Sequence, residues 1–202
     1  MTAVQSICVF CGSKDGEGTL YREAAYQLGA LFAKEHIRLV YGGGNLGLMG
    51  HVARGALDHG GKVTGIIPHF LTRVEKIGES LHELDEVHIT KTMHERKMLM
   101  YQKSDAFVAL PGGIGTLEEL VEQLTWAQLG QHRKPVVLAD IDGFWQPFFV
   151  LLAHMEKTGF IRAEPPVACL SAAAINDVLP VIRTALLRQS GDEAPGRISE
   201  RF

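Results

Sequence analysis

The stretch PGGIGTLEE, Pro111 to Glu119, decides the expected fold of this chain. An apolar segment with strand character, residues 105–110, precedes it. A helical pattern follows it, with apolar residues on one stripe at Leu117, Leu120, Val121 and Leu124. The stretch is therefore expected to be a turn between a strand and a helix. Its glycines let main-chain N–H groups approach a ligand, and the helix dipole adds positive potential, so we expect a phosphate site.

Two further glycine turns also follow strand-like segments. Cys11-Gly12-Ser13 comes after residues 6–10, and Gly42-Gly-Gly-Asn-Leu-Gly47 comes after residues 37–41. In doubly wound parallel sheets, ligands bind outside the carboxyl ends of the strands. The three turns are therefore expected to converge on one site.

Strand-like and helix-like segments alternate along the chain. The predicted strands are residues 6–10, 37–41, 62–67, 85–90, 105–110, 135–139 and 167–170. The predicted helices are 20–35, 46–59, 91–103, one from the PGG turn, 144–157 and 175–187, while 68–83 contains a short helix at best. This alternation predicts a single α/β domain at 1–187, a doubly wound parallel sheet with helices on both faces. Residues 188–202, in which glycine and proline stand among charges, are expected to be a flexible tail.

Composition excludes some classes of ligand. The 202 residues have a formal net charge of −3 and a pI near 6.3, which gives no general attraction to nucleic acid or to an anionic membrane. Phosphate binding must then be local, as for a small phosphorylated ligand. No basic segment precedes the first apolar run, and no apolar stretch approaches the roughly 20 residues of a membrane span, so we expect a soluble cytoplasmic protein.

The cysteines do not form a metal motif. Cys8 and Cys11 make a lone CxxC without a second pair or a neighbouring histidine cluster, and Cys8 falls inside a predicted strand. We expect both, and Cys169, to be reduced thiols packed in the core. No metal site is expected.

Three motifs carry a family resemblance. The stretch Pro111 to Glu119 resembles the PGGxGTxxE motif of the LONELY GUY family, and MHERK stands at residues 93–97. The third, YGGGxxGLMG, occupies residues 41–50. Members of this family are phosphoribohydrolases that cleave nucleoside 5′-monophosphates and activate cytokinins. The likeness extends over about residues 4–187.

The resemblance implies a Rossmann-like homodimer without a metal or redox cofactor, acting on AMP or a cytokinin ribotide. It implies Arg96 and Glu119 as catalytic residues. The substrate-binding residues it implies are Gly12, Ser13, Gly43, Gly44, Asn45, Gly47, Met49, Met93, Lys97, Pro111, Gly112, Gly113, Gly115 and Thr116. Lys14 departs from the family, which usually has a second serine there. Members are often labelled lysine decarboxylases, but no lysine of this chain is marked by its context as a Schiff-base residue.

Several of these residues also have other interpretations. Gly42, Gly44 and Gly47 satisfy the dinucleotide pattern GxGxxG, but the next strand ends without an acid for the ribose, and Asp58 falls inside the preceding helix. These glycines can instead serve tight turns alone. Thr116 to Glu119 matches a helix capping box. Arg96 and Lys97 can be surface charges, and His94 is as suited to packing as to binding.

The chemistry of N-ribosyl cleavage fits Arg96 and Glu119. Positive charge builds on the sugar, so a carboxylate beside C1′ stabilises it and can orient or deprotonate water. A guanidinium can hold substrate oxygens bidentately and keep that carboxylate ionised. No residue identifies itself as the acid for the departing base. The rival hypothesis is a nucleotide-binding or carrier module without turnover.

The helix expected at 144–157 has more apolar surface than one stripe needs. Large side chains include Trp145, Phe148 and Phe149. This surplus indicates burial against a partner as well as against the core, which agrees with a homodimer.

Overall fold

The computed structural model describes residues 4–72, 81–161, 167 and 169–191. Within these residues the strands form one parallel sheet in the order β4-β3-β2-β1-β5-β6-β7. The strands are β1 Ser6–Phe10, β2 Arg38–Tyr41, β3 Val63–Pro68, β4 Glu86–Thr90, β5 Ala106–Ala109, β6 Val136–Ala139 and β7 Leu170–Ala172. The helices are α1 Leu20–Lys34, α2 Gly47–Asp58, α3 Met93–Gln102, α4 Ile114–Gln128, α5 Gln146–Lys157 and α6 Val178–Gly191.

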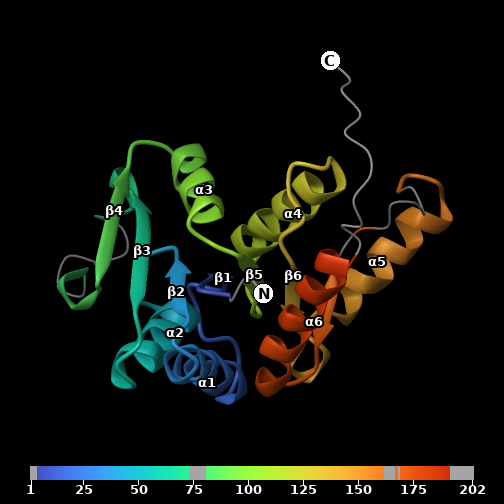
Figure 1. Cartoon of the computed structure of the whole chain (residues 1–202). Coiled ribbons are helices and arrows are strands. Elements are labelled where there is room, and N and C mark those ends of the chain that lie inside the picture. The colour runs from blue at the N-terminus through green and yellow to red at the C-terminus, as the bar shows by residue number, and fades with distance from the viewer. Residues whose placement is uncertain (1–3, 73–80, 162–166, 168, 192–202) are drawn as a thin grey trace.

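Helices cover both faces of the sheet (Figure 1). Ile7 and Val9 of β1 pack into a core cluster with α1, α2 and α6, whereas Cys8 and Phe10 pack into a second cluster with α3 and α4. Successive strand residues point to opposite faces, so one strand contributes to both cores. The predicted doubly wound parallel sheet is confirmed.

The C-terminal elements differ from the sequence prediction. The last strand begins at Leu170, not at residue 167, and residues 175–177 form a short 3₁₀ helix, η5 Ile175–Asp177, ahead of α6. Helix α6 continues to Gly191, so the first four residues of the expected tail are helical. The remainder of that tail, 192–202, lies outside the described residues.

Residues 68–83, where the sequence predicted a short helix at best, contain two short 3₁₀ helices, η1 His69–Leu71 and η3 Leu81–Glu83. Residues 73–80 lie outside the described part of the chain. A further 3₁₀ turn, η4 Ile141–Gly143, precedes α5. In the described residues no helix has the length and the apolar composition that crossing a membrane requires.

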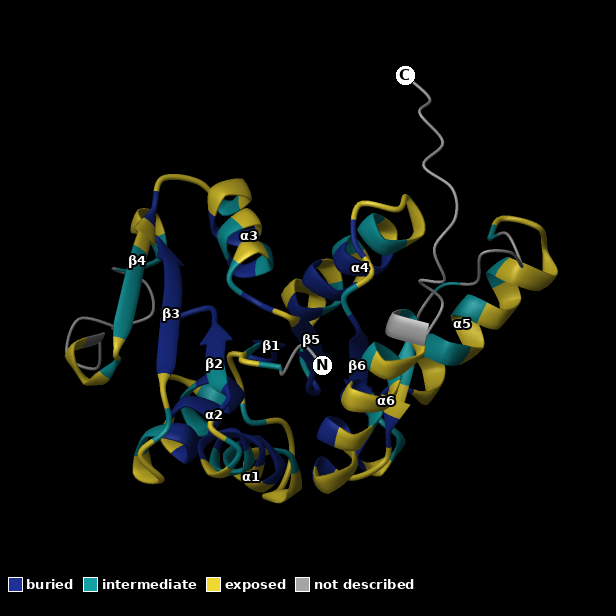
Figure 2. Cartoon of the chain, viewed as in Figure 1, coloured by how far each residue is buried: buried dark blue, intermediate teal, exposed yellow. Residues whose placement is uncertain are grey.

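Trp145, one of the large apolar residues of the helix expected at 144–157, packs in the core. Its side chain is buried, and the indole Nε1–H donates a hydrogen bond of 3.1 Å to the carbonyl oxygen of Ala109. The residues of α5 itself, which follow Trp145, are more exposed. None of the residues of α5, all of which the structure describes, is fully buried (Figure 2).

Candidate active site

Three loops meet where the central strands end. In the sheet, β1 lies between β2 and β5, so the loops that follow these three strands emerge side by side at one edge. The main chain of Gly12 connects them. Its N–H donates to the carbonyl oxygen of Pro111 at 3.1 Å, and its own carbonyl accepts from the N–H of Met49 at 3.3 Å.

The close approach of these loops depends on glycine at two positions. A Cβ on Gly12 would lie 3.3 Å from Cα of Gly112, so a larger residue would push the first and third loops apart. Gly47 has φ +59°, and a Cβ there would overlap the backbone of Ser13 and Lys14. The glycines therefore allow backbone-to-backbone contact between segments that are distant in sequence.

Helix α4 begins at this junction. Its N-cap is Gly113, no side chain caps it, and Thr116 lies inside the first turn. The capping-box interpretation of Thr116 and Glu119 is therefore wrong, because the helix starts earlier than that motif requires. The first N–H groups of α4 have no partner within the helix and lie beside a cavity, so with the helix dipole they favour an anion there.

Helix α3 presents Arg96 to the same place. The Thr92 hydroxyl accepts from the N–H of Glu95 at 3.1 Å, and the Glu95 carboxylate accepts from the N–H of Lys91 at 2.8 Å. These two hydrogen bonds fix the first turn of α3. Arg96 comes one residue later, so its direction is set by a well-defined helix start.

Arg96 and Glu119 form a buried ion pair. Arg96 Nη2 lies 3.3 Å from Glu119 Oε1, and only 10% and 11% of the two side chains is exposed. Arg96 Nη1 also lies 3.8 Å from the sulfur of Met93. The Nε of Arg96 is buried without a hydrogen-bond partner among the described residues, which leaves a donor for a ligand oxygen.

Gly42, the residue that follows β2, makes room for the guanidinium. A Cβ on Gly42 would overlap Arg96 Nη2. Any side chain at this position would therefore displace the guanidinium. The glycine pattern after β2 thus has a role beyond the turn itself.

Burial raises the pKa of the Glu119 carboxyl above its ordinary value of 4.5, and Glu118 and Glu122 act in the same direction. The positive charges of Arg96 and Lys97 oppose this shift. Burial wins because the carboxylate has lost most of its hydration. A raised pKa favours the protonated form of the carboxyl. When the group is ionised, the same shift makes it a stronger base and a better proton acceptor.

A cavity of about 490 Å³ contains this pair, a size suited to a small ligand. Among the sequence-predicted residues, the cavity is lined by Gly12, Ser13, Met49, Arg96, Pro111, Gly112, Gly113, Gly115, Thr116 and Glu119. The predicted residues that do not line it are Gly43, Gly44, Asn45, Gly47, Met93 and Lys97. The Lys97 ammonium is bound by two carboxylates of α4, those of Glu118 and Glu122.

Sequence reasoning missed part of the lining. The additional residues are Cys11, Lys14, Asp15, Gly16, Tyr21, Leu48, Ile114 and Phe144. Most of them are neighbours of the recognised motifs and could have been found from that proximity. Tyr21 and Phe144 come from elsewhere and meet edge to face at a centroid distance of 5.8 Å. No sequence pattern connects those two rings.

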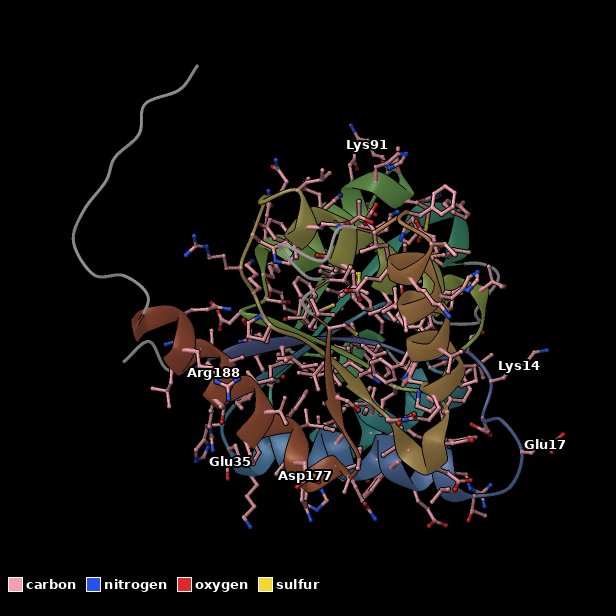
Figure 3. All side chains as sticks on the ribbon, turned by 90° about the vertical axis from the view of Figure 1, so that its right-hand side faces the viewer. Lys14, Glu17, Glu35, Lys91, Asp177 and Arg188 are labelled. Atoms are coloured by element: carbon pink, nitrogen blue, oxygen red, sulfur yellow. The ribbon has the colours of Figure 1, made fainter. Side chains whose placement is uncertain are left out.

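The first loop places opposite charges at the mouth of the cavity. Lys14 is exposed, and Figure 3 shows its side chain extending away from the body of the molecule. The Asp15 carboxylate lies 3.1 Å from Nε2 of His51 on α2. The departure at Lys14 therefore adds an exposed cation to the lining of the cavity, where the resemblance implies a hydroxyl.

The structure gives no support for a dinucleotide site. Asp58 is the last residue of α2, where it accepts a hydrogen bond from Tyr26 at 3.1 Å. The strand after it, β3, ends at Pro68 and carries no acid. Across the described residues, no group of three or more histidine, cysteine or acidic side chains could hold a metal ion. Cys8 and Cys11 are free and buried.

Comparison with known proteins agrees with these motifs. Residues 49–181 match the family model described as "Possible lysine decarboxylase". A probable cytokinin riboside 5′-monophosphate phosphoribohydrolase of Oryza sativa subsp. japonica is 47% identical over 173 residues, which cover 86% of this chain and 76% of the relative. The chain belongs to the LONELY GUY family.

Two other proteins resemble this chain, one in sequence and one in solved structure. A cytokinin riboside 5′-monophosphate phosphoribohydrolase of Rhodococcoides fascians is 41% identical over 180 residues, 89% of this LONELY GUY chain and 90% of the relative. The solved molybdenum cofactor binding protein of Rippkaea orientalis is 26% identical, with a TM-score of 0.67 over 92% of this chain and 99% of that one. The fold of this chain thus also occurs in a protein named for binding a molybdenum cofactor.

The raised pKa of Glu119 predicts how stability depends on pH. An acid whose pKa is higher in the folded state stabilises the fold below its unfolded pKa, and that contribution is lost as the pH rises through the folded pKa. From pH 4.5 upward, the unfolding free energy of wild type should therefore fall relative to that of Glu119→Gln. Urea denaturation of both proteins from pH 4.5 to 8 measures this difference.

Glu17→Gln is the matched control, because Glu17 is exposed on the loop between β1 and α1 (Figure 3). Its stability curve should run parallel to that of wild type. A difference for Glu119→Gln that stays constant would show that Arg96 cancels the effect of burial, and one that changes in the opposite direction would show that Arg96 outweighs it.

Proposed function

We propose that this protein hydrolyses the N-glycosidic bond of a nucleoside 5′-monophosphate and releases a free base and ribose 5-phosphate. The observation that carries the proposal is the buried Arg96–Glu119 pair, which faces a cavity beside the N-terminus of α4. The names of the relatives at 47% and 41% identity support it. The substrate is AMP or a cytokinin ribotide.

The N-terminus of α4 is suited to the 5′-phosphate. Its free N–H groups come from a glycine-rich segment with little side-chain bulk, so phosphate oxygens can approach them. Binding a group remote from the reacting bond supplies energy for orienting the sugar. The phosphate is then a recognition element of the substrate.

Glu119 is the candidate for chemistry at C1′. As the C1′–N bond breaks, its electron pair leaves with the base and positive charge develops on the ribose. The carboxylate stabilises that charge and accepts a proton from the water whose oxygen bonds to C1′. The departing base takes up a proton from solvent, which balances the reaction. Arg96 holds Glu119 and offers its Nε and Nη groups to substrate oxygens.

The proposal needs no metal or redox cofactor, and the ligand is a small molecule instead of a nucleic acid or a membrane. A cytoplasmic location stays a prediction of the sequence. The alternative function is a carrier without turnover, which the resemblance to a molybdenum cofactor binding protein favours. Release of free base separates the two, because a carrier leaves its ligand intact.

The phosphate requirement gives the first functional test. We expect AMP or isopentenyladenosine 5′-monophosphate to yield free base, with adenosine cleaved hardly at all, because adenosine cannot use the α4 site. Chromatography of the products measures the free base. In the same assay, Glu119→Gln should lose about 10²- to 10⁴-fold in kcat, since an amide cannot accept a proton.

Equal turnover of AMP and adenosine would contradict phosphate recognition. Normal turnover by Glu119→Gln would remove Glu119 from the mechanism. Binding of AMP without any release of base would favour the carrier.

Gly42→Ala tests whether the position of Arg96 matters. The added methyl overlaps the guanidinium, and because a side-chain end can move aside, the fold should survive with a melting temperature close to that of wild type. Misplacing a catalytic group by about 1 Å can cost about 10²-fold in rate, so kcat for AMP should fall by that order.

Gly65→Ala is the control for Gly42→Ala. It places a methyl in β3, 2.7 Å from Cδ1 of Leu84 and 3.3 Å from Cα of Gly43, and this methyl does not contact Arg96. Its turnover of AMP should match that of wild type. If Gly42→Ala is equally active, the displacement of Arg96 has no catalytic consequence.

We also propose that the protein is a homodimer through the face formed by α4 and α5. Val150 and Leu151 of α5 are 69% and 45% exposed, and Val121 of α4 is 42% exposed. Phe160, just after α5, is 88% exposed. Large apolar side chains that stay open to water favour association between copies.

Light scattering tests the dimer. Wild type should have about twice the 22.1 kDa mass of one chain at micromolar concentration, and Val150→Asp with Leu151→Asp should shift it toward monomer. Leu187→Asp changes an exposed leucine of α6 and should remain dimeric. A wild-type mass of 22.1 kDa would reject the proposal.

A further inference from the structure

Lys97 is the neighbour of Arg96 on α3, and it contacts α4 instead of the cavity. Its Nζ donates to Oε1 of Glu118 at 2.7 Å and to Oε1 of Glu122 at 2.8 Å. Only 8% of the Lys97 side chain is exposed. The ammonium is thus held between two carboxylates one helical turn apart.

Neither Lys97 nor its two partners lines the cavity, whereas the neighbours Arg96 and Glu119 do. Consecutive cations on α3 therefore meet acids on one side of α4 in a fixed order. Arg96 takes Glu119, and Lys97 takes Glu118 and Glu122. Burial alone would lower the pKa of Lys97, but its hydrogen bonds to the two glutamates outweigh burial and raise it, so the ammonium stays charged.

The order of these pairs matters because Glu118 and Glu119 are adjacent in sequence. Without Lys97, the carboxylate of Glu118, whose side chain is 52% exposed, would be hydrated, whereas that of Glu122, whose side chain is 19% exposed, would lose its ammonium partner. A carboxylate left without its cation on α4 would compete with Glu119 for the charge of Arg96. Occupying these two acids with Lys97 leaves Glu119 as the partner of Arg96.

We propose that Lys97 is a positioning residue, which locks α3 to α4 so that Arg96 meets Glu119, and that it does not bind the substrate. The proposal rests on the proposed function for its kinetic test. It assigns the same task to Glu122, which does not line the cavity and holds Lys97 through a hydrogen bond of 2.8 Å.

Steady-state kinetics with AMP separate positioning from binding. A loosened site can lose about 10²-fold in rate, so Lys97→Met should lower kcat by about 10- to 100-fold while KM for AMP stays within about threefold. Glu122→Ala should show the same pattern to a lesser degree. The double variant should be no worse than Lys97→Met, because both changes remove one contact.

Lys103→Met is the matched control. Lys103 caps the far end of α3 and pairs with Glu86 at 2.8 Å, away from α4. The substitution Lys103→Met removes a lysine ion pair at the C-terminal end of the same helix, and it should leave kcat and KM unchanged. Should Lys97→Met instead raise KM strongly with kcat retained, and Glu122→Ala have no effect, Lys97 contacts the phosphate and the proposal is overturned.

A crystal structure of Lys97→Met tests the inference without any assay. The proposal expects Arg96 Nη2 to leave its position 3.3 Å from Glu119 Oε1. An unchanged Arg96–Glu119 contact would overturn it. Failure of wild type to release base from AMP or isopentenyladenosine 5′-monophosphate would reject the proposed function alone, and this crystal structure would then decide the role of Lys97.

Discussion

The buried ion pair between Arg96 and Glu119 is the interaction on which the site depends. Both groups have lost most of their water, and each is tolerable in that position only because the other is within 3.3 Å. Such a pair contributes little net stability, since desolvation offsets the Coulomb attraction. Its presence in the cavity is therefore better explained by chemistry than by folding. The two core clusters on either side of the sheet stabilise the fold.

Several local features serve this one contact. The Thr92 and Glu95 hydrogen bonds define where α3 begins, and Gly42 leaves room for the guanidinium. On the other side, the Gly12 backbone joins the loop before α4 to the sheet, which fixes the origin of the helix that carries Glu119. Each element is held by short-range contacts that tolerate little substitution. A site built this way is preorganised before a ligand enters it.

The sequence was sufficient where the physics is local. Alternation of apolar segments predicted the order of strands and helices, and the glycine turns after strands predicted where they would converge. The sequence did not predict the features that depend on tertiary packing. Thr116 matched a cap, but α4 begins three residues earlier than that cap requires, and the hydrogen bond from Trp145 Nε1–H to the carbonyl of Ala109 had no signal in the sequence. The partners of Lys97 and the meeting of Tyr21 with Phe144 depend on helix placement, which no spacing encodes.

Topology explains why residues so distant in sequence meet. The chain runs outward from β1 to β4 on one side, and α3 then carries it back across the sheet to β5 on the other side of β1. The strand order reverses between β1 and β5, and in such sheets the crevice at the reversal binds the ligand. Because α3 is the connection that returns to this point and α4 is the first helix to leave it, Arg96 and Glu119 lie on the two helices that border the crevice. The right-handed crossover rule fixes the face that each helix covers, and here both cover the same face. The meeting of the two charges is thus a consequence of the winding of the sheet, and the hydrogen bonds of Lys97 refine it.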